Sequence, residues 1–142
     1  MKALVVYDSV YGNTKLVAEE IAVNLGKGAK WVSVSEVKDK DLEGLELLVV
    51  GSPILGWRPS EKTSAFLSRL KPGKLKDMKV AAFDTRMRIF FHGDAARKIA
   101  AVLQKEGGSL VGEPTGFIVE GRQGPLACDA LQKAKDWALT LH

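Results

Sequence analysis

A short polar segment near the start of the chain has the residue types of a phosphate-binding turn. It follows an apolar run, Ala3–Tyr7, and precedes Thr14–Leu25, whose apolar residues have helical spacing. A turn that opens a helix directs backbone N–H groups toward an anion, and short polar side chains add further donors. The candidate phosphate-binding residues are Ser9, Val10, Tyr11, Gly12, Asn13 and Thr14. An ordinary capped turn is the alternative, because Ser, Asn and Thr are common capping residues.

Two common nucleotide-binding motifs are absent after the first strand. Neither GxxxxGK followed by Ser or Thr, which holds triphosphates, nor GxGxxG, which holds dinucleotides, occurs there. Hydrolysis of ATP or GTP is therefore not expected. Residues 9–14 contain no cation, so the segment suits a phosphate that is bound by hydrogen bonds.

A tryptophan lies in a second polar segment, Gly51–Ser60, between two prolines. A core would not require Trp57 in such a loop, and an indole stacks on flat heteroaromatic rings with about 0.5–1.5 kcal/mol beyond area burial. The sequence therefore favours Trp57 as a ligand-binding residue, with a place at the sheet edge or surface as the alternative. Trp31 and Trp137 are expected in the core.

A third segment, Asp84–Gly93, mixes two arginines with apolar residues. Exposed apolar side chains beside Arg86 and Arg88 would form the rim of a binding site. The alternative is that Ile89–Phe91 pack into the core as a short turn. His92 belongs to no visible triad and is expected on the surface.

Alternating strands and helices would bring these segments together. The pattern predicts strands at Ala3–Tyr7, Trp31–Val34, Leu45–Gly51, Val80–Phe83 and Thr115–Val119, the last preceded by an interruption at Gly112 and Pro114. It predicts helices at Thr14–Leu25, Glu61–Leu70, residues 94–104, and from Pro125 onward. This alternation indicates one domain of 142 residues with a parallel sheet covered on both faces. Such sheets bind ligands beyond the carboxyl ends of their strands.

Composition argues against two classes of partner. Apolar residues make up 46% of the chain, but no apolar run approaches the roughly 20 residues of a membrane span. The net charge is +4, yet the chain has no basic tail, zinc-ligand set or aromatic–basic stripe, so no nucleic acid is expected. The single cysteine, and a first strand with no signal peptide before it, predict a cytoplasmic protein.

Together the three segments resemble the flavodoxin family of FMN-binding electron carriers. Its phosphate loop, S/T-x-S/T-G-x-T, is matched by residues 9–14 except at Tyr11, whose ring hydroxyl cannot replace a short one. The other matching motifs are Gly51-Ser52-Pro53, Gly56-Trp57, Asp84-Thr85-Arg86 and Gly124-Pro125-Leu126. The resemblance covers essentially the whole chain. It implies an α/β, flavodoxin-like, doubly wound five-stranded parallel sheet of order 2-1-3-4-5 with helices on both faces.

The resemblance implies FMN as cofactor and electron transfer to redox partner proteins, with no catalytic residue or metal site. The turn after the first strand would hold the phosphate, Trp57 would cover one face of the ring, and Gly56 would permit a peptide flip at its edge. The implied cofactor-binding residues are Ser9, Val10, Tyr11, Gly12, Asn13, Thr14, Pro53, Ile54, Leu55, Gly56, Trp57, Thr85, Arg86 and Met87.

Two other functions are weighed against an electron carrier. An FMN-dependent oxidoreductase of a quinone or other small acceptor stays open, because the third segment contains no tyrosine to cover the second ring face. A phosphoreceiver is disfavoured, because Asp8 has no acidic neighbour and Glu120-Gly121 stands where a lysine is needed. The sequence leaves the oligomeric state open.

Charge separates this sequence from the typically acidic flavodoxins. Arg58, Arg86 and Arg88 lie in the two segments that would frame the ring. We expect these cations to make the reduction potential of the fully reduced flavin less negative, and to favour acidic partners. Cys128, expected in the first turn of the last helix, is interpreted as an unreactive small residue.

Overall fold

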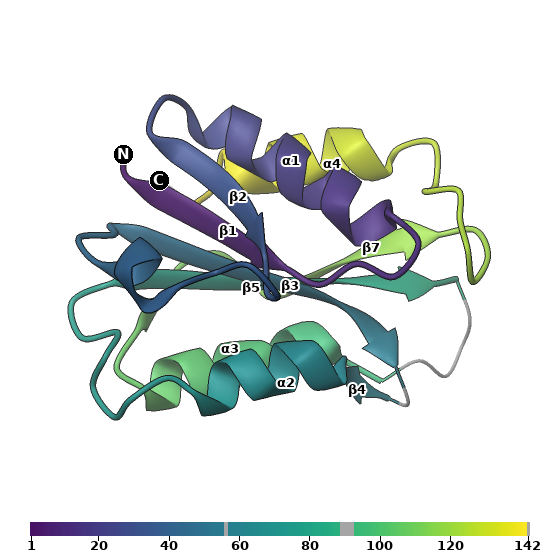
Figure 1. The fold of residues 1–142 in the computed structure, drawn as a ribbon. Helices are drawn as coiled ribbons and strands as arrows, with labels where there is room; N and C mark the ends of the chain where they lie inside the picture. Colours follow the sequence, from purple (N-terminus) through teal and green to yellow (C-terminus); the bar gives the residue numbers. More distant parts are fainter. Residues whose placement is uncertain (56, 89–92, 142) are drawn as a thin grey trace.

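A twisted parallel sheet between two layers of helices forms the centre of the computed structural model (Figure 1). The structure describes residues 1–55, 57–88 and 93–141. The strands are β1 (Ala3–Tyr7), β2 (Ala29–Ser33), β3 (Leu47–Leu55), β4 (Arg58–Pro59), β5 (Lys79–Met87), β6 (Ser109–Leu110) and β7 (Thr115–Val119). The helices are α1 (Asn13–Leu25), α2 (Glu61–Ser68), α3 (Ala95–Lys105) and α4 (Ala130–Ala138), with a 3-10 turn, η1 (Asp39–Leu42).

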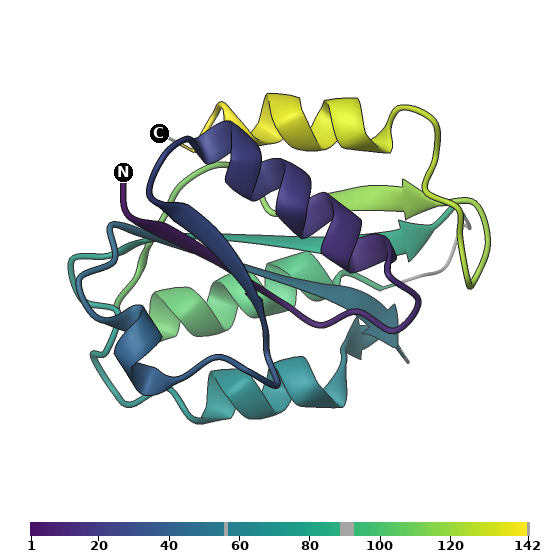
Figure 2. The ribbon, with the colours of Figure 1, turned by 45° about the horizontal axis from the view of Figure 1, so that its top comes forward.

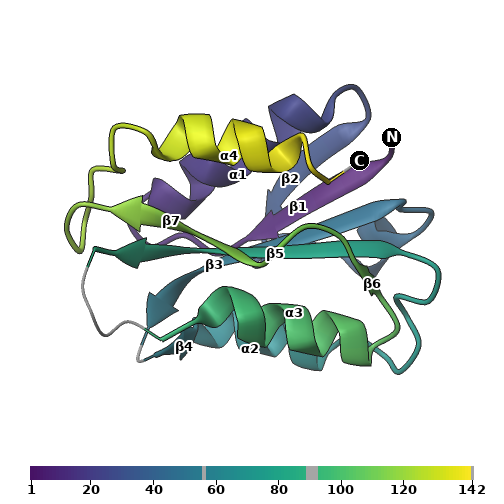
Figure 3. The same ribbon diagram turned by 180° about the vertical axis from the view of Figure 1, so that it is seen from behind.

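The sheet order is β2-β1-β3-β5-β6, and β7 also pairs with β5. β6 pairs with the start of β5 and β7 with its end, so the two short strands occupy one position in the sheet (Figure 3). Gly112 and Pro114 lie between them, where the sequence predicts an interruption. The predicted order 2-1-3-4-5 is therefore confirmed. The higher number of strands in the described residues comes from this split and from β4, a short antiparallel addition to β3.

Each face of the sheet carries a separate apolar core. Because successive strand residues point to opposite faces, Val5 packs toward α1 and α4 while Val6 packs toward α2 and α3. On the first face Phe83, Phe117 and Trp137 meet edge to face, with ring centroids 5.9–6.1 Å apart. The predicted core position of Trp137 is confirmed. None of the described helices is long and apolar enough to cross a membrane.

Two strands continue beyond the ends that the sequence predicts. Ser52–Leu55 belongs to β3 and Thr85–Met87 to β5, although both were expected to be loops. The reason is pairing at long range: Pro53 pairs with Thr85, and Met87 pairs with Val119 of β7. Local turn residues do not reveal such partners.

Two further expectations are wrong. The last helix begins at Ala130 and not at Pro125, because the Gly124–Pro125 bond is cis and Leu126 forms an antiparallel bridge with Val119. Cys128 therefore lies before the helix, where it is exposed. Trp31 is also exposed, because β2 lies at the edge of the sheet, where β1 is its one partner among the described strands.

Candidate functional site

The carboxyl ends of β1, β3, β5 and β7 converge on one edge of the sheet (Figure 2). A cavity of about 590 Å³ opens there, within the usual size range of small-molecule sites. Its lining contains most of the predicted site residues: Val10, Tyr11, Asn13, Thr14, Pro53, Ile54, Leu55, Trp57, Thr85, Arg86 and Met87. Ser9 and Gly12 do not line it, and Gly56 lies outside the described residues, as do Ile89–Phe91 and His92.

The turn after β1 is held in shape by its own serine. Ser9 Oγ accepts hydrogen bonds from the amides of Gly12 (3.0 Å) and Lys15 (3.3 Å). Gly12 has φ +94°, a left-handed conformation that favours glycine. Ser9 and Gly12 therefore shape the turn, and α1 begins directly after it.

The first two amides of α1 are available to a ligand. Within the described residues, the N–H groups of Asn13 and Thr14 donate to no protein atom, and both residues line the cavity. Thr14 Oγ1 lies 2.8 Å from Thr85 Oγ1, a buried hydrogen bond that joins the turn to β5. When Thr85 is the donor, the Thr14 hydroxyl proton is available to an acceptor in the cavity.

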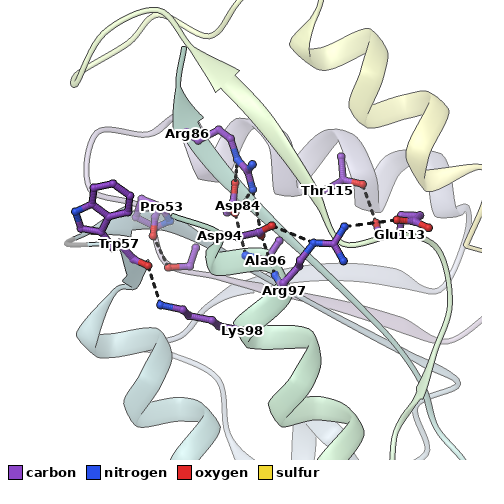
Figure 4. A network of polar contacts seen from close by, with 11 residues as sticks. Pro53, Trp57, Asp84, Arg86, Asp94, Ala96, Arg97, Lys98, Glu113 and Thr115 are labelled. Atoms are coloured by element: carbon purple, nitrogen blue, oxygen red, sulfur yellow. Dashed lines mark hydrogen bonds and ion pairs between the residues drawn. The ribbon is translucent and has the colours of Figure 1, made fainter. Parts of the chain in front are cut away.

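Trp57 lies at the end of the β3–β4 hairpin and is 54% exposed beside the cavity. Its backbone has φ +70°, which is rare for a bulky residue. Contacts from the α3 side support this conformation: Lys98 Nζ donates to Trp57 O (2.9 Å), as Figure 4 shows. A Cβ atom at Gly93 would lie 2.6 Å from Trp57 O, so only glycine allows this close approach.

Arg86, one of the residues that line the cavity, forms an ion pair with the buried Asp84 (Figure 4). Asp84, fully buried, accepts from Arg86 Nε and Nη2 (2.7 and 2.6 Å) and from the Ala96 amide (2.9 Å). Burial raises the pKa of Asp84, while the hydrogen bonds from Arg86 and Ala96 partly oppose that shift. The hydrogen bond to Asp84 raises the pKa of Arg86, which stays charged. A Cβ at Gly116 would overlap Arg86 Nε, so β7 needs glycine there.

The effect of Arg86 and Arg88 on the reduction potential of the flavin stays a prediction, but both arginines are paired with acidic side chains in the structure. Arg86 is paired with Asp84 and lies 3.3 Å from Asp94, and Arg88 pairs with Glu120 at 3.0 Å. Arg58 is exposed on β4 and does not line the cavity. Asp84 lies two residues from Arg86 on the same strand, whereas Asp94 and Glu120 meet Arg86 and Arg88 from outside β5, which the sequence pattern does not reveal.

The lining includes three residues that the sequence-based site omits: Val119, Gly121 and Arg122. They belong to the connection between β7 and α4. Its Gly124-Pro125-Leu126 motif is part of the family resemblance, and this motif is the sequence signal that points to the neighbouring lining residues. The helix predicted from Pro125 leaves these three residues in a connecting segment outside the sequence-based site.

A family model described as a flavodoxin domain matches residues 4–112, more than half of the chain. The chain belongs to this family. No curated protein matches the sequence. Among solved structures, an archaeal flavodoxin superposes with a TM-score of 0.84 at 23% identity, covering 99% of this chain and 96% of that one. Flavodoxin 1 from Bacillus cereus superposes with a TM-score of 0.83 at 17% identity, covering 99% of this chain and 97% of that one. A flavodoxin, WrbA-like protein from Agrobacterium tumefaciens superposes with a TM-score of 0.79 at 18% identity, covering 98% of this chain and 93% of that one.

Proposed function

We propose that this flavodoxin-domain protein binds FMN in the cavity and transfers electrons through it. One observation carries the proposal: the cavity joins two features that a flat-ringed mononucleotide requires. The amino end of α1 lies on one side of it and the exposed indole of Trp57 on another. Membership of the family supports the same ligand.

The turn Ser9–Thr14 suits the phosphate group. The amides of Asn13 and Thr14, which donate to no atom of the described residues, lie at a helix amino end, where aligned backbone dipoles favour an anion. When Thr85 donates to Thr14 Oγ1, the Thr14 hydroxyl adds a further donor to this turn. This turn contains no cation, so its contribution comes from oriented hydrogen bonds.

The segments after β3 and β5 suit the ring. Trp57 is an exposed aromatic residue of the lining whose indole suits stacking, and Pro53, Ile54 and Met87 add apolar lining. When bound, FMN supplies the redox chemistry, by accepting and donating electrons. The protein residues would fix the position of the ring and set its electrostatic surroundings.

The partners we propose are redox proteins that carry acidic patches. Exposed apolar side chains surround the cavity: Val10, Tyr11, Leu55, Trp57 and Met87. A partner protein that binds to these exposed side chains would come close to the flavin ring at the mouth of the cavity. The chain's net charge of +4 would favour acidic partners by electrostatic steering.

Titration of the purified, flavin-free protein with FMN tests the proposal. We expect saturable quenching of flavin fluorescence with one FMN per chain and a protein-bound flavin absorption spectrum. A protein that takes up no FMN would contradict it. The alternative, an FMN-dependent oxidoreductase of a quinone or other small acceptor, is separated by a second assay. Steady oxidation of NADH or NADPH by the loaded protein alone would favour that enzyme over a carrier.

A further inference from the structure

The cavity contains two arginines with different surroundings. Within its described lining, Arg86 and Arg122 are the charged residues. Two carboxylates, Asp84 and Asp94, lie within ion-pair distance of the Arg86 guanidinium. Its charge is therefore balanced within the protein and attracts a ligand anion only weakly.

Arg122 lies at the tip of a small hairpin after β7. Gly124 N donates to Gly121 O (3.1 Å), which places Arg122 and Gln123 at the centre of a four-residue turn. The bridge between Val119 and Leu126 closes the base of this hairpin. The turn therefore presents an exposed arginine at the cavity wall.

No described carboxylate pairs with Arg122. Glu120, the acid two residues earlier, instead contacts Arg88 Nη2 at 3.0 Å. The pairing of Arg88 with Glu120 thus leaves Arg122 as the unpaired cation of the described cavity lining.

The Arg122 turn packs against the phosphate-binding turn. Asn13 Nδ2 donates to the carbonyl of Gln123 (3.2 Å), the residue next to Arg122. A Cβ at Gly124 would lie 2.9 Å from Asn13 Oδ1, so the two turns are in close contact. These contacts connect Arg122 with the amino end of α1 and not with the Trp57 hairpin.

We propose that Arg122 binds the phosphate group of the flavin and makes the cavity selective for FMN over riboflavin. This rests on the proposed function and extends it to a residue outside the phosphate turn. A guanidinium donates parallel hydrogen bonds to phosphate oxygens and adds a charge that the neutral amides of Asn13 and Thr14 lack. Riboflavin has the same ring without the phosphate, so it measures the ring contacts alone.

Affinities of flavin-free protein for FMN and riboflavin, followed by flavin fluorescence, test this role. Arg122→Gln should lower the affinity for FMN about tenfold and change the affinity for riboflavin by less than about twofold. Arg122→Lys should restore most of the FMN affinity, because it keeps the charge. Arg58→Gln is the matched control, because Arg58 is exposed and does not line the cavity. Added salt should weaken FMN binding more for the natural protein than for Arg122→Gln.

The outcomes separate this inference from the proposed function. An unchanged ratio of FMN to riboflavin affinity in Arg122→Gln would overturn the role of Arg122 while FMN binding stands. Equal weakening of both flavins would overturn it as well, because Arg122 would then act on the ring. Failure of the natural protein to bind either flavin would overturn the proposed function itself.

Discussion

The turn after β1 and the strand ends after β3 and β5 form one cavity but are held in different ways. The turn is shaped by local contacts, such as the bond from Gly12 N to Ser9 Oγ, three residues apart. The Trp57 hairpin depends on Lys98, which is 41 residues away. The Asp84–Arg86 pair depends on Ala96 and on the absence of a side chain at Gly116. The turn also has two long-range side-chain contacts, Thr14 with Thr85 and Asn13 with Gln123. We therefore infer that substitutions near Lys98, Ala96 or Gly116 change the ring side of the cavity, around Trp57 and Arg86, and spare the phosphate side, residues 9–14.

The substitution with the largest expected effect is Asp84→Ala, which removes contacts that support the ring side of the cavity. Asp84→Ala removes the acceptor of both Arg86 and the Ala96 amide, and leaves a buried cation without its main partner. The free energy of unfolding should fall by about 3 kcal/mol in urea denaturation. If the variant folds, both FMN and riboflavin should bind more weakly, because Asp84 no longer holds Arg86 in place on the ring side.

The control for this change is Glu113→Ala. Glu113 is 86% exposed and contacts Arg97 at 3.9 Å, so its loss should change stability by less than about 0.5 kcal/mol. An Asp84→Ala protein as stable as Glu113→Ala would show that the buried pair does not support the ring side.

The second effect is confined to the phosphate side. Thr14→Val removes a hydroxyl proposed to donate to the phosphate, at a site that is 2% exposed. A hydrogen bond to a charged group contributes about 2 kcal/mol, so FMN should bind roughly thirtyfold more weakly. Riboflavin affinity, measured by the same fluorescence titration, should not change. Equal losses for both flavins would place the hydroxyl at the ring and contradict the division between the two sides.

The third effect compares two exposed tryptophans. Trp57→Ala should lower the affinities for FMN and for riboflavin alike by about tenfold, because both flavins carry the ring that would stack on Trp57. Trp31→Ala is its control: Trp31 is 42% exposed, compared with 54% for Trp57, but lies on the edge strand β2. Isothermal titration calorimetry of both variants checks this. Loss of binding in Trp31→Ala, or none in Trp57→Ala, would contradict stacking on Trp57.

The smallest effect is a pH dependence that Asp84→Asn should remove. Burial raises the pKa of Asp84 in the folded protein above the value of 3.8 for an ordinary aspartate. The folded state therefore holds this proton to higher pH than the unfolded state. The resulting stabilisation is fully present below 3.8 and is lost as pH rises through the folded-state value.

Urea denaturation of both proteins at a series of pH values from neutral to acidic provides the measurement. As pH falls, the natural protein should gain stability relative to Asp84→Asn. A relative loss would indicate that Arg86 lowers the pKa of Asp84 more than burial raises it.

Strand and helix periodicity predicts the alternating elements of the parallel sheet, and residues 9–14 are a local signal for one turn of the site. The sheet order and most of the lining follow from the family resemblance. Sequence patterns miss what depends on distant partners. The strands end later than predicted because Thr85–Met87 pairs with β7. Arg86 also contacts Asp94, which comes from the amino end of α3. Arg122 enters the cavity because a turn, and not a helix, follows β7.

Nuclear magnetic resonance of the ¹⁵N-labelled, flavin-free protein tests the central claim most directly. We expect FMN to shift the amide signals of Asn13 and Thr14 strongly, and riboflavin to leave them nearly unchanged. Both flavins should shift the indole N–H signal of Trp57. Binding of FMN without movement of the Asn13 and Thr14 amides, or without movement of the Trp57 indole, would contradict this account of the site.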